Sequence, residues 1–215
     1  MRTTQTETQY QAVRETEAPE NAANHLRHIV RRDLARHFGY ERQPNPWRAA
    51  LAKKTFGPVF ALRHYQYWAA RRGPGAALAR AFFRLMHRWA CGRLGIDLPI
   101  TTRIGGGFRI IHGYGLVVNA RAEIGEDVTV FQGVTIGQRD VIRPEGRTTV
   151  HARIGNRVTL SPYAQIVGAM VGDGATVAPL TVVHRDVAAA TVVGGNPMKI
   201  LKEDAMADVR YGQAS

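Results

Sequence analysis

Residues 124–137 read IGEDVTVFQGVTIG, and an aliphatic residue returns in this stretch every six positions. The same step recurs in four blocks between residues 104 and 183, at Ile104, Ile110, Leu116, Ile124, Val130, Ile136, Ile154, Leu160, Ile166, Val171, Val177 and Val183. A period of six is neither that of a helix nor the alternation of a half-buried strand. It favours short strands joined by tight turns and stacked as a solenoid. An ordinary antiparallel sandwich would also place valines between turn residues, but its loops would vary in length.

Three such strands are predicted to close one triangular coil, with each aliphatic residue and the residue two positions before it pointing inward. Glycine directly follows the aliphatic residue at Gly105, Gly125, Gly137, Gly155 and Gly172. We expect these glycines to form the corners of the coil, because glycine tolerates a positive φ. The polar stretch 139–147 interrupts the six-residue step. It is expected to be a loop that leaves the coil, and long loops of this kind are often functional.

The chain divides into four predicted segments. Residues 1–23 are rich in Thr, Gln and Glu and are expected to form a disordered tail, and residues 204–215 a short polar one. Residues 24–96 are expected to be an α-helical domain, and 97–203 the solenoid. The predicted helices run from Ala23 to about Phe38, from Trp47 to Arg71 and from Ala76 to Leu94. Pro44, Pro46 and the Gly73-Pro74-Gly75 stretch separate them, because proline cannot continue a helix.

Composition narrows the possible settings of the protein. No apolar run approaches the roughly 18 residues that a membrane-spanning helix needs. The first residues lack the basic and then apolar pattern of a secretion signal. Cys91 is the single cysteine among 215 residues, so no disulfide can form within the chain. A cytoplasmic protein is expected by default.

Positive charge is concentrated in the first half of the chain. Residues 1–96 contain 17 Lys or Arg and 6 Asp or Glu, whereas residues 97–215 contain 12 and 11. We expect no nucleic-acid partner. Contact of the basic half with a membrane or an acidic polymer stays open beside a simply solvated helical surface. The apolar side of the third helix, with Ala79, Phe82, Phe83, Met86, Trp89 and Ala90, is expected to pack on the solenoid end as a cap.

Histidine supplies the candidate catalytic groups. His112 falls at a predicted corner, between residues where a solenoid normally has something small, and a titratable side chain there suits chemistry better than packing. His151 lies where the interrupting loop rejoins the coil, and His184 lies on the last turn. No two histidines are five residues apart, the spacing seen in the zinc-binding carbonic anhydrases of this fold, so no metal is expected.

Six segments carry a resemblance to a known family: 95–99, 104–105, 112–119, 124–137, 151–155 and 193–199. They resemble the catalytic half of the serine acetyltransferases, which are hexapeptide-repeat acyltransferases that use acetyl-CoA. The resemblance implies a left-handed parallel β-helix, preceded here by α-helices, and acetyl transfer from acetyl-CoA to the hydroxyl of L-serine. It also implies a homotrimer, or a hexamer of two trimers, with acceptor and CoA sites between adjacent prisms.

The same resemblance assigns roles to individual residues. Asp97 stands fifteen residues before His112, as the family's aspartate stands before its catalytic histidine. His112 is therefore expected to be the general base and Asp97 the group that orients it. His151 corresponds to the family's second active-site histidine and is expected to contact the acceptor. The residues expected to bind acetyl-CoA are Gly137, Ser161, Pro162, Ala178, Pro179 and Lys199.

Three positions depart from the family pattern and leave the acceptor open. Ile111 and Gln43 occupy acceptor-binding positions where the family has aspartate, and Val150 replaces an arginine. Serine would lack the expected partners for its charged groups. A sugar hydroxyl of an exopolysaccharide or a nucleotide sugar is the alternative acceptor. A non-catalytic trimeric scaffold that displays its basic helices is the alternative of another class.

Overall fold

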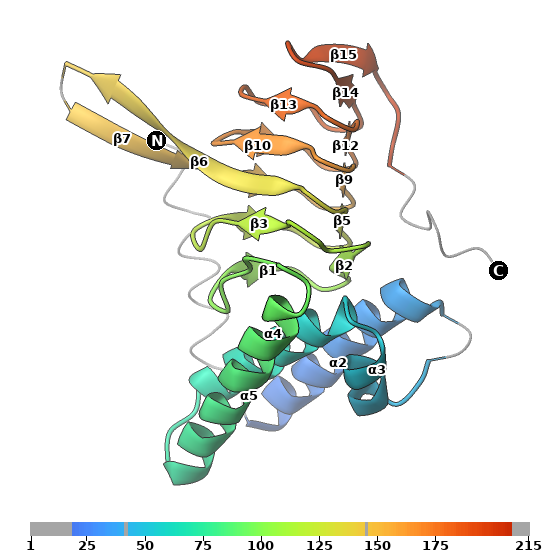
Figure 1. Cartoon of the computed structure of the whole chain (residues 1–215), viewed down its shortest axis with the longest axis vertical. Helices are drawn as coiled ribbons and strands as arrows, with labels where there is room; N and C mark the ends of the chain where they lie inside the picture. Colours follow the sequence, from blue (N-terminus) through green and yellow to red (C-terminus); the bar gives the residue numbers. More distant parts are fainter. Residues whose placement is uncertain (1–18, 41–42, 145, 208–215) are drawn as a thin grey trace.

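The structure, a computed structural model, describes residues 19–40, 43–144 and 146–207. Within these residues, four helices stand at one end of a column of short strands (Figure 1). They are α2 (Pro19–Phe38), α3 (Pro46–Ala52), α4 (Phe56–Ala69) and α5 (Pro74–Gly92). Helix α2 begins at Pro19, so the end of the predicted tail is wrong for residues 19–23. The rest of that tail, 1–18, lies outside the described residues, as do 208–215 of the C-terminal tail.

The single helix predicted over 47–71 is also wrong, because the chain turns between α3 and α4. Pro58 explains the break. It lacks an N–H group, and its ring would clash with the carbonyl of Lys54 in a continuous helix. In the first turn of α4 the missing N–H has no cost, because no helical carbonyl precedes it there.

The strands form three parallel sheets that are the faces of a triangular prism. The first face contains β1 (Arg103–Ile104), β4 (Glu123–Ile124), β8 (Arg153–Ile154) and β11 (Met170–Val171). The second contains β2 (Arg109–Ile110), β5 (Thr129–Val130), β9 (Thr159–Leu160), β12 (Thr176–Val177), β14 (Val192–Gly194) and the antiparallel β15 (Lys199–Lys202). The third contains β3 (Val117–Val118), β6 (Thr135–Arg143), β10 (Gln165–Val167) and β13 (Val182–Val183).

Aliphatic side chains stack inside the prism, as the six-residue step predicts. On the second face Ile110, Val130, Leu160 and Val177 are aligned coil upon coil, and each is at most 1% exposed. The register predicted at Leu116 is wrong by two residues. Val118, not Leu116, aligns with Ile136, because the corner at residues 111–115 is longer than the others.

Glycine follows the aliphatic residues for a different physical reason from the one expected. Gly105, Gly125, Gly155 and Gly172 do not have a positive φ. A Cβ on Gly125 would instead lie 2.7 Å from the backbone of Gly155 in the next coil, and one on Gly105 would lie 2.6 Å from Gly125. Such distances are far inside a normal van der Waals contact. Close stacking of successive corners, and not backbone freedom, requires glycine at these positions.

The predicted loop over 139–147 is a β-hairpin arm. Strand β6 continues out of the third face and pairs antiparallel with β7 (Gly146–His151), from Gln138 opposite His151 to Arg143 opposite Gly146. Figure 1 shows the arm projecting sideways from the prism. Asp140 supports the pairing, since it accepts hydrogen bonds from Arg147 and from the hydroxyl of Thr149 across the arm. β-branched residues such as Thr149 also favour a strand over an irregular loop.

Helices α2 and α4 close the open end of the prism through polar side chains. Asp33 and Arg63 form a buried ion pair, with 2.9 Å between Asp33 Oδ2 and Arg63 Nε. The other Asp33 oxygen accepts from the N–H of Phe108 at 2.9 Å, and Arg63 donates to the carbonyl oxygens of Ile104 and Gly105. Burial raises the pKa of the Asp33 carboxyl, and the charge of Arg63 opposes that rise. The pair therefore satisfies backbone groups that the first coil leaves without a neighbouring coil.

His37 also lies between α2 and the first coil, and its ring is neutral. Its Nδ1 lies 2.8 Å from the carbonyl oxygen of Asp33, which can only accept, and its Nε2 lies 3.4 Å from the N–H of Ile110, which can only donate. Only the neutral tautomer with its proton on Nδ1 satisfies both. Burial, with the nearby positive charge of Lys53 and Arg109, lowers the pKa of His37 to about 3.

Helix α5 packs on α4 through one of two apolar faces. Phe83 and Ala90 are buried, as expected, but Phe82 and Trp89 are exposed by 52% and 51%. The expectation that all the apolar residues of this helix pack inward is wrong for these two. A helix presents one stripe to a neighbour, and Phe82 lies next to Phe83 in sequence but on another side of the helix.

Candidate active site

His112 lies at the corner between β2 and β3, in the first coil. Its φ is 62°, in the left-handed region that few residues other than glycine adopt. Gly113 and Gly115 follow it with φ of 47° and 71°, so the whole corner is held in a conformation that side chains normally avoid. Tyr163 and Leu180, at the equivalent corners of later coils, have φ of 61° and 59°, so this backbone conformation belongs to the repeat. His112 differs from them in standing in a corner that is two residues longer. The side chain of His112 is exposed on the single chain.

Asp97 lies next to this corner, in a short strand-like segment below the first coil. Its N–H donates to the carbonyl of Leu116, and its own carbonyl accepts from the N–H of Val118, both at 2.8 Å. This parallel bridge, between Asp97 and Val117, continues the third face by one residue. The Asp97 side chain is exposed, and no hydrogen bond in the described chain joins it to His112. The orienting role of Asp97 stays a prediction.

His151 lies at another edge of the prism, where β7 turns into β8. The ring is half-buried, and its Nδ1 is enclosed without a hydrogen-bond partner in the described structure. His112 turns the chain from the second face to the third, whereas His151 turns it from the third face to the first. The two histidines that the sequence groups together therefore stand on different edges of one chain.

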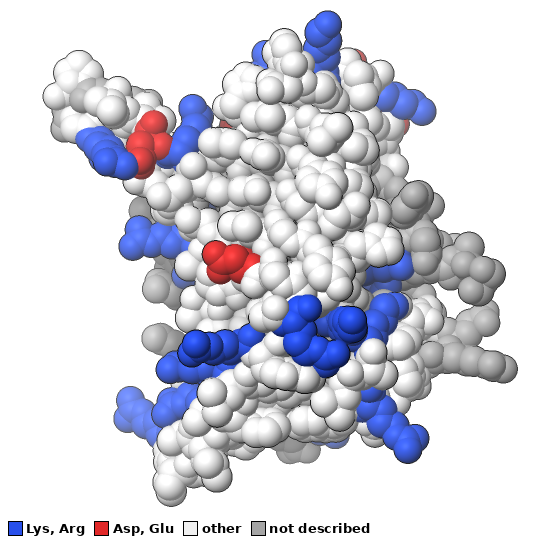
Figure 2. All heavy atoms as spheres, viewed as in Figure 1, with Lys and Arg blue, Asp and Glu red and all other residues white. Residues whose placement is uncertain are grey.

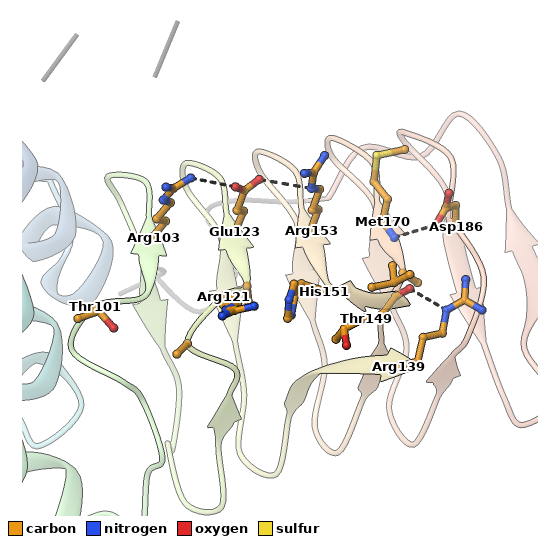
Figure 3. A pocket seen from close by; sticks show the side chains of 15 residues that line it. Thr101, Arg103, Arg121, Glu123, Arg139, Thr149, His151, Arg153, Met170 and Asp186 are labelled. Atoms are coloured by element: carbon orange, nitrogen blue, oxygen red, sulfur yellow. Dashed lines mark hydrogen bonds and ion pairs between the residues drawn. The ribbon is translucent and has the colours of Figure 1, made fainter. Parts of the chain in front are cut away.

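A hollow of about 750 Å³ lies beside His151, between the first face and the hairpin arm. In Figure 3, Arg121 and His151 lie side by side in one row, and Arg103, Glu123 and Arg153 lie in a second row above them. Glu123 pairs with both arginines of the second row, at 3.2 and 3.4 Å. Arg121 makes no ion pair within the described chain, so the hollow has positive charge to offer an anion.

Arg121 is a site residue that sequence reasoning missed. It follows Asn119, which ends the first coil, and its N–H donates to the side-chain oxygen of Asn119 at 2.8 Å. The signal was present, because Arg121 stands two residues before β4 and His151 stands two residues before β8, and these two strands are paired in register. Arg139 is a second missed residue. It lines the hollow from the base of the arm, and its Nε donates to the carbonyl of Gly168 at 3.0 Å.

Of the residues expected to bind acetyl-CoA, all but Lys199 lie on the edge of His112 or on the edge of His151. Ser161 and Pro162 in the third coil, and Ala178 and Pro179 in the fourth, follow β9 and β12, so they stand on the edge that carries His112. The N–H of Leu180 donates to the carbonyl of Pro162 at 3.0 Å, which stacks these corners directly. Gly137 lies on the edge of His151, opposite Val167. Lys199 is exposed in β15, at the far end of the prism.

The two altered acceptor positions are not brought together. Ile111 precedes His112 in the same corner and is half-buried, with its N–H bonded to the carbonyl of Val130 at 2.8 Å. Gln43 is exposed in the connection between α2 and α3, and no hydrogen bond in the described residues ties its side chain to the prism. Among the described residues, no group of three or more His, Cys, Asp or Glu is placed to hold a metal ion.

Known proteins resemble the chain in sequence and in fold. It is 33% identical over 111 residues to serine acetyltransferase of Helicobacter pylori, an alignment that covers 51% of this chain and 63% of that protein. Serine acetyltransferase from Brucella abortus in complex with coenzyme A has a TM-score of 0.66 at 20% identity, covering 88% of this chain and 72% of that one. Soybean serine acetyltransferase complexed with serine has a TM-score of 0.63 at 27% identity, covering 82% and 69%.

No protein-family model matches the chain, and the chain spans less than two thirds of the length of the H. pylori relative. The six-residue step predicts the solenoid, and the family resemblance implies that it is a left-handed parallel β-helix preceded by α-helices; this fold agrees with the solved structures. The resemblance stated from sequence is confirmed as well: the chain is similar to the serine acetyltransferases in sequence over about half of its length and in fold over most of it.

Proposed function

We propose that the protein is an O-acetyltransferase that moves an acetyl group from acetyl-CoA to the hydroxyl of a small acceptor, with L-serine as the first candidate. The observation that carries this proposal is the lengthened corner that exposes His112, with Asp97 paired to the strand that follows it. The relatives support it, because one is a serine acetyltransferase with coenzyme A bound and another has serine bound.

His112 supplies the general base in this mechanism. It takes the hydroxyl proton as the acceptor oxygen attacks the thioester carbon, and it returns that proton to the sulfur of CoA as the carbon–sulfur bond breaks. Asp97 would hold the ring and stabilise the imidazolium that forms between the two steps. Positioned general-base catalysis contributes about 10²- to 10⁴-fold. Holding both substrates together must supply much of the remaining acceleration.

The site is completed by a second copy of the chain in a homotrimer. Because His112 and His151 stand on different edges of one prism, they can face a single acceptor only when two prisms lie side by side. The hairpin arm has the form needed to reach a neighbour, and Ile142 in it is 84% exposed. The corners at Ser161–Pro162 and Ala178–Pro179 would then flank the CoA chain on the His112 edge.

The acceptor should carry a negative charge. Val150 stands where the family has an arginine, but Arg121 and Arg139 line the hollow beside His151 and restore positive charge there. A carboxylate buried without a partner would cost several kcal/mol, and these arginines remove that cost. Serine satisfies this condition. A sugar acid hydroxyl is the second candidate, because Ile111 and Gln43 offer no carboxylate to an ammonium group.

Release of the CoA thiol from acetyl-CoA, measured with serine, serinamide, a neutral sugar and a sugar acid, tests the proposal. His112→Asn should lower turnover at least about a hundredfold, while His184→Asn, at an exposed histidine of another corner, should not change it. Arg121→Gln should raise KM for serine but not for serinamide, which lacks the carboxylate. Retention of more than about a tenth of turnover by His112→Asn would remove His112 from the role of base.

A further inference from the structure

Helix α5 exposes a row of large apolar side chains. Leu78, Phe82, Leu85 and Trp89 are exposed by 75%, 52%, 67% and 51%. Their spacings of four, three and four residues place them along one side of the helix. The opposite side, with Phe83 and Ala90, is buried in the helical domain. Contiguous apolar surface of this kind marks a binding face on soluble proteins.

The row extends beyond α5 and has cations at its margin. Trp89 borders a small hollow that Leu51 of α3, Lys54 and Arg93 also line. Leu51 is 64% exposed, and the Arg93 guanidinium carbon lies 4.5 Å from the centre of the Trp89 ring. Arg88, which directly precedes Trp89 in α5, is also exposed. Apolar side chains thus form the centre of this surface and positive charges its border.

The surroundings of the row are uniformly basic. Residues 42–96 contain 11 Lys or Arg and no Asp or Glu. Figure 2 shows Lys and Arg side chains gathered over and beside the helices, whereas the acidic residues visible in that view lie on the prism and its arm. Two copies docked through this face would bring arginines against arginines. An acidic polymer would pair with the arginines but leave the four apolar side chains in water.

We propose that α5 docks the protein on a membrane surface rich in anionic lipid. Leu78, Phe82, Leu85 and Trp89 would enter the boundary between headgroups and acyl chains, and Lys54, Arg88 and Arg93 would contact lipid phosphates. This is the arrangement of an amphipathic interfacial helix. No helix of the described residues is long and apolar enough to cross a membrane. The inference does not depend on the proposed acetyl transfer, because it uses a different surface.

Co-sedimentation of the full chain with vesicles tests this docking. We expect binding to vesicles of phosphatidylglycerol and phosphatidylcholine, about tenfold weaker binding to phosphatidylcholine alone, and a decrease with salt. The double variant L78S/L85S should lose about tenfold or more, because each apolar side chain adds to membrane affinity. The matched control I200S/L201S, at two exposed residues of β15, should bind like the original protein.

Three results would overturn the proposal. The first is equal binding of L78S/L85S, which would leave a purely electrostatic attraction. The second is a lipid-free self-association that L78S/L85S abolishes, which would make a second copy of the chain the occupant. The third is no binding to either vesicle type.

Tryptophan fluorescence tests the orientation of the docked helix. A blue shift of the emission on vesicles that Trp89→Phe removes would place this side chain in the interface, and a shift that persists in Trp89→Phe would contradict the docked orientation.

Discussion

The two halves of the molecule are stabilised by different means. In the prism, aliphatic side chains repeat coil after coil in register, and Lys and Arg nearly balance Asp and Glu. In the helical half the basic residues are in large excess, and charged groups such as Asp33, Arg36 and Arg63 are buried where the helices meet the first coil. Repetition specifies the prism. The helices attach to it through polar contacts between residues distant in sequence and through Val59, Leu62 and Leu94, which pack on the prism core.

The largest effect is expected where a polar contact is broken in the helical half. Asp33→Ala should lower the free energy of unfolding by about 3–5 kcal/mol, because it leaves the Arg63 charge buried without its partner. The N–H of Phe108 loses its acceptor in the same variant. Glu126→Ala removes an exposed carboxylate paired with Arg32 and should cost less than about 1 kcal/mol. Urea titration measures the free energy of unfolding of both variants. Equal losses would show that burial of the Asp33–Arg63 pair does not add to its contribution.

A similar or slightly smaller loss is expected in the prism. Leu160→Ala should cost about 2–5 kcal/mol, because the side chain is fully buried between Val130 and Val177 and its removal leaves a cavity. Leu180→Ala, at a residue that is 70% exposed, is the control and should cost much less. Thermal unfolding of both variants checks the prediction. A small loss at Leu160 would mean that neighbouring coils collapse readily into the space.

The glycine corners provide a finer test of coil stacking. Gly125→Ala should cost about 1–3 kcal/mol through overpacking, since its Cβ would lie 2.7 Å from the next coil. Gly137→Ala is matched to it, because Gly137 also follows an aliphatic residue but its Cβ would meet nothing closer than 3.6 Å. Gly137→Ala should therefore be tolerated. If both variants lose the same stability, the requirement lies in backbone conformation and not in stacking.

A further effect concerns pH, and it is small near neutral pH and grows as the pH falls. Burial holds the pKa of His37 at about 3, below the ordinary value of about 6.5. The unfolded chain binds a proton between these values and the folded chain does not. The contribution of His37 to the free energy of unfolding is therefore fully present above about pH 6.5. It decreases as the pH drops toward 3, by at most about 1.4 kcal/mol per pH unit.

His37→Gln should flatten that dependence, while His28→Gln, at an exposed histidine of the same helix, should leave it unchanged. Equilibrium unfolding at pH 7, 6, 5 and 4 measures the slope for each protein. An unaltered slope in His37→Gln would show that the ring becomes protonated in the folded state.

Sequence predicted the prism well because each coil repeats the same physical demand. The stack of Ile110, Val130 and Leu160 follows directly from the six-residue step. The errors fall where a residue departs from the repeat. The long corner around His112 shifted the register from Leu116 to Val118, and the arm over 139–147 formed a hairpin because its pairing partners lie within the insertion itself.

The helical attachment and the site could not be predicted in the same way. Asp33 and Arg63 lie 30 residues apart on different helices, and neither stands out by spacing. Their contact depends on how the helices are placed, which periodicity does not encode. Arg121 is different, because the repeat aligns β4 with β8 and so places Arg121 on the edge of His151. His112 was identifiable from its corner and from the family resemblance, but its separation from His151 required the structure.

Activity of mixed trimers tests most directly the central claim, that His112 of one chain and His151 of another form one site. His112→Asn and His151→Asn, each inactive alone, are co-expressed with different tags, and trimers that carry both tags are purified. Each mixed trimer should regain about one third of its sites, because whichever variant is present twice, one of the three interfaces joins an intact His112 to an intact His151 of the neighbouring chain. Mixed trimers as inactive as the separate variants, or a His151→Asn protein that is fully active alone, would contradict the account.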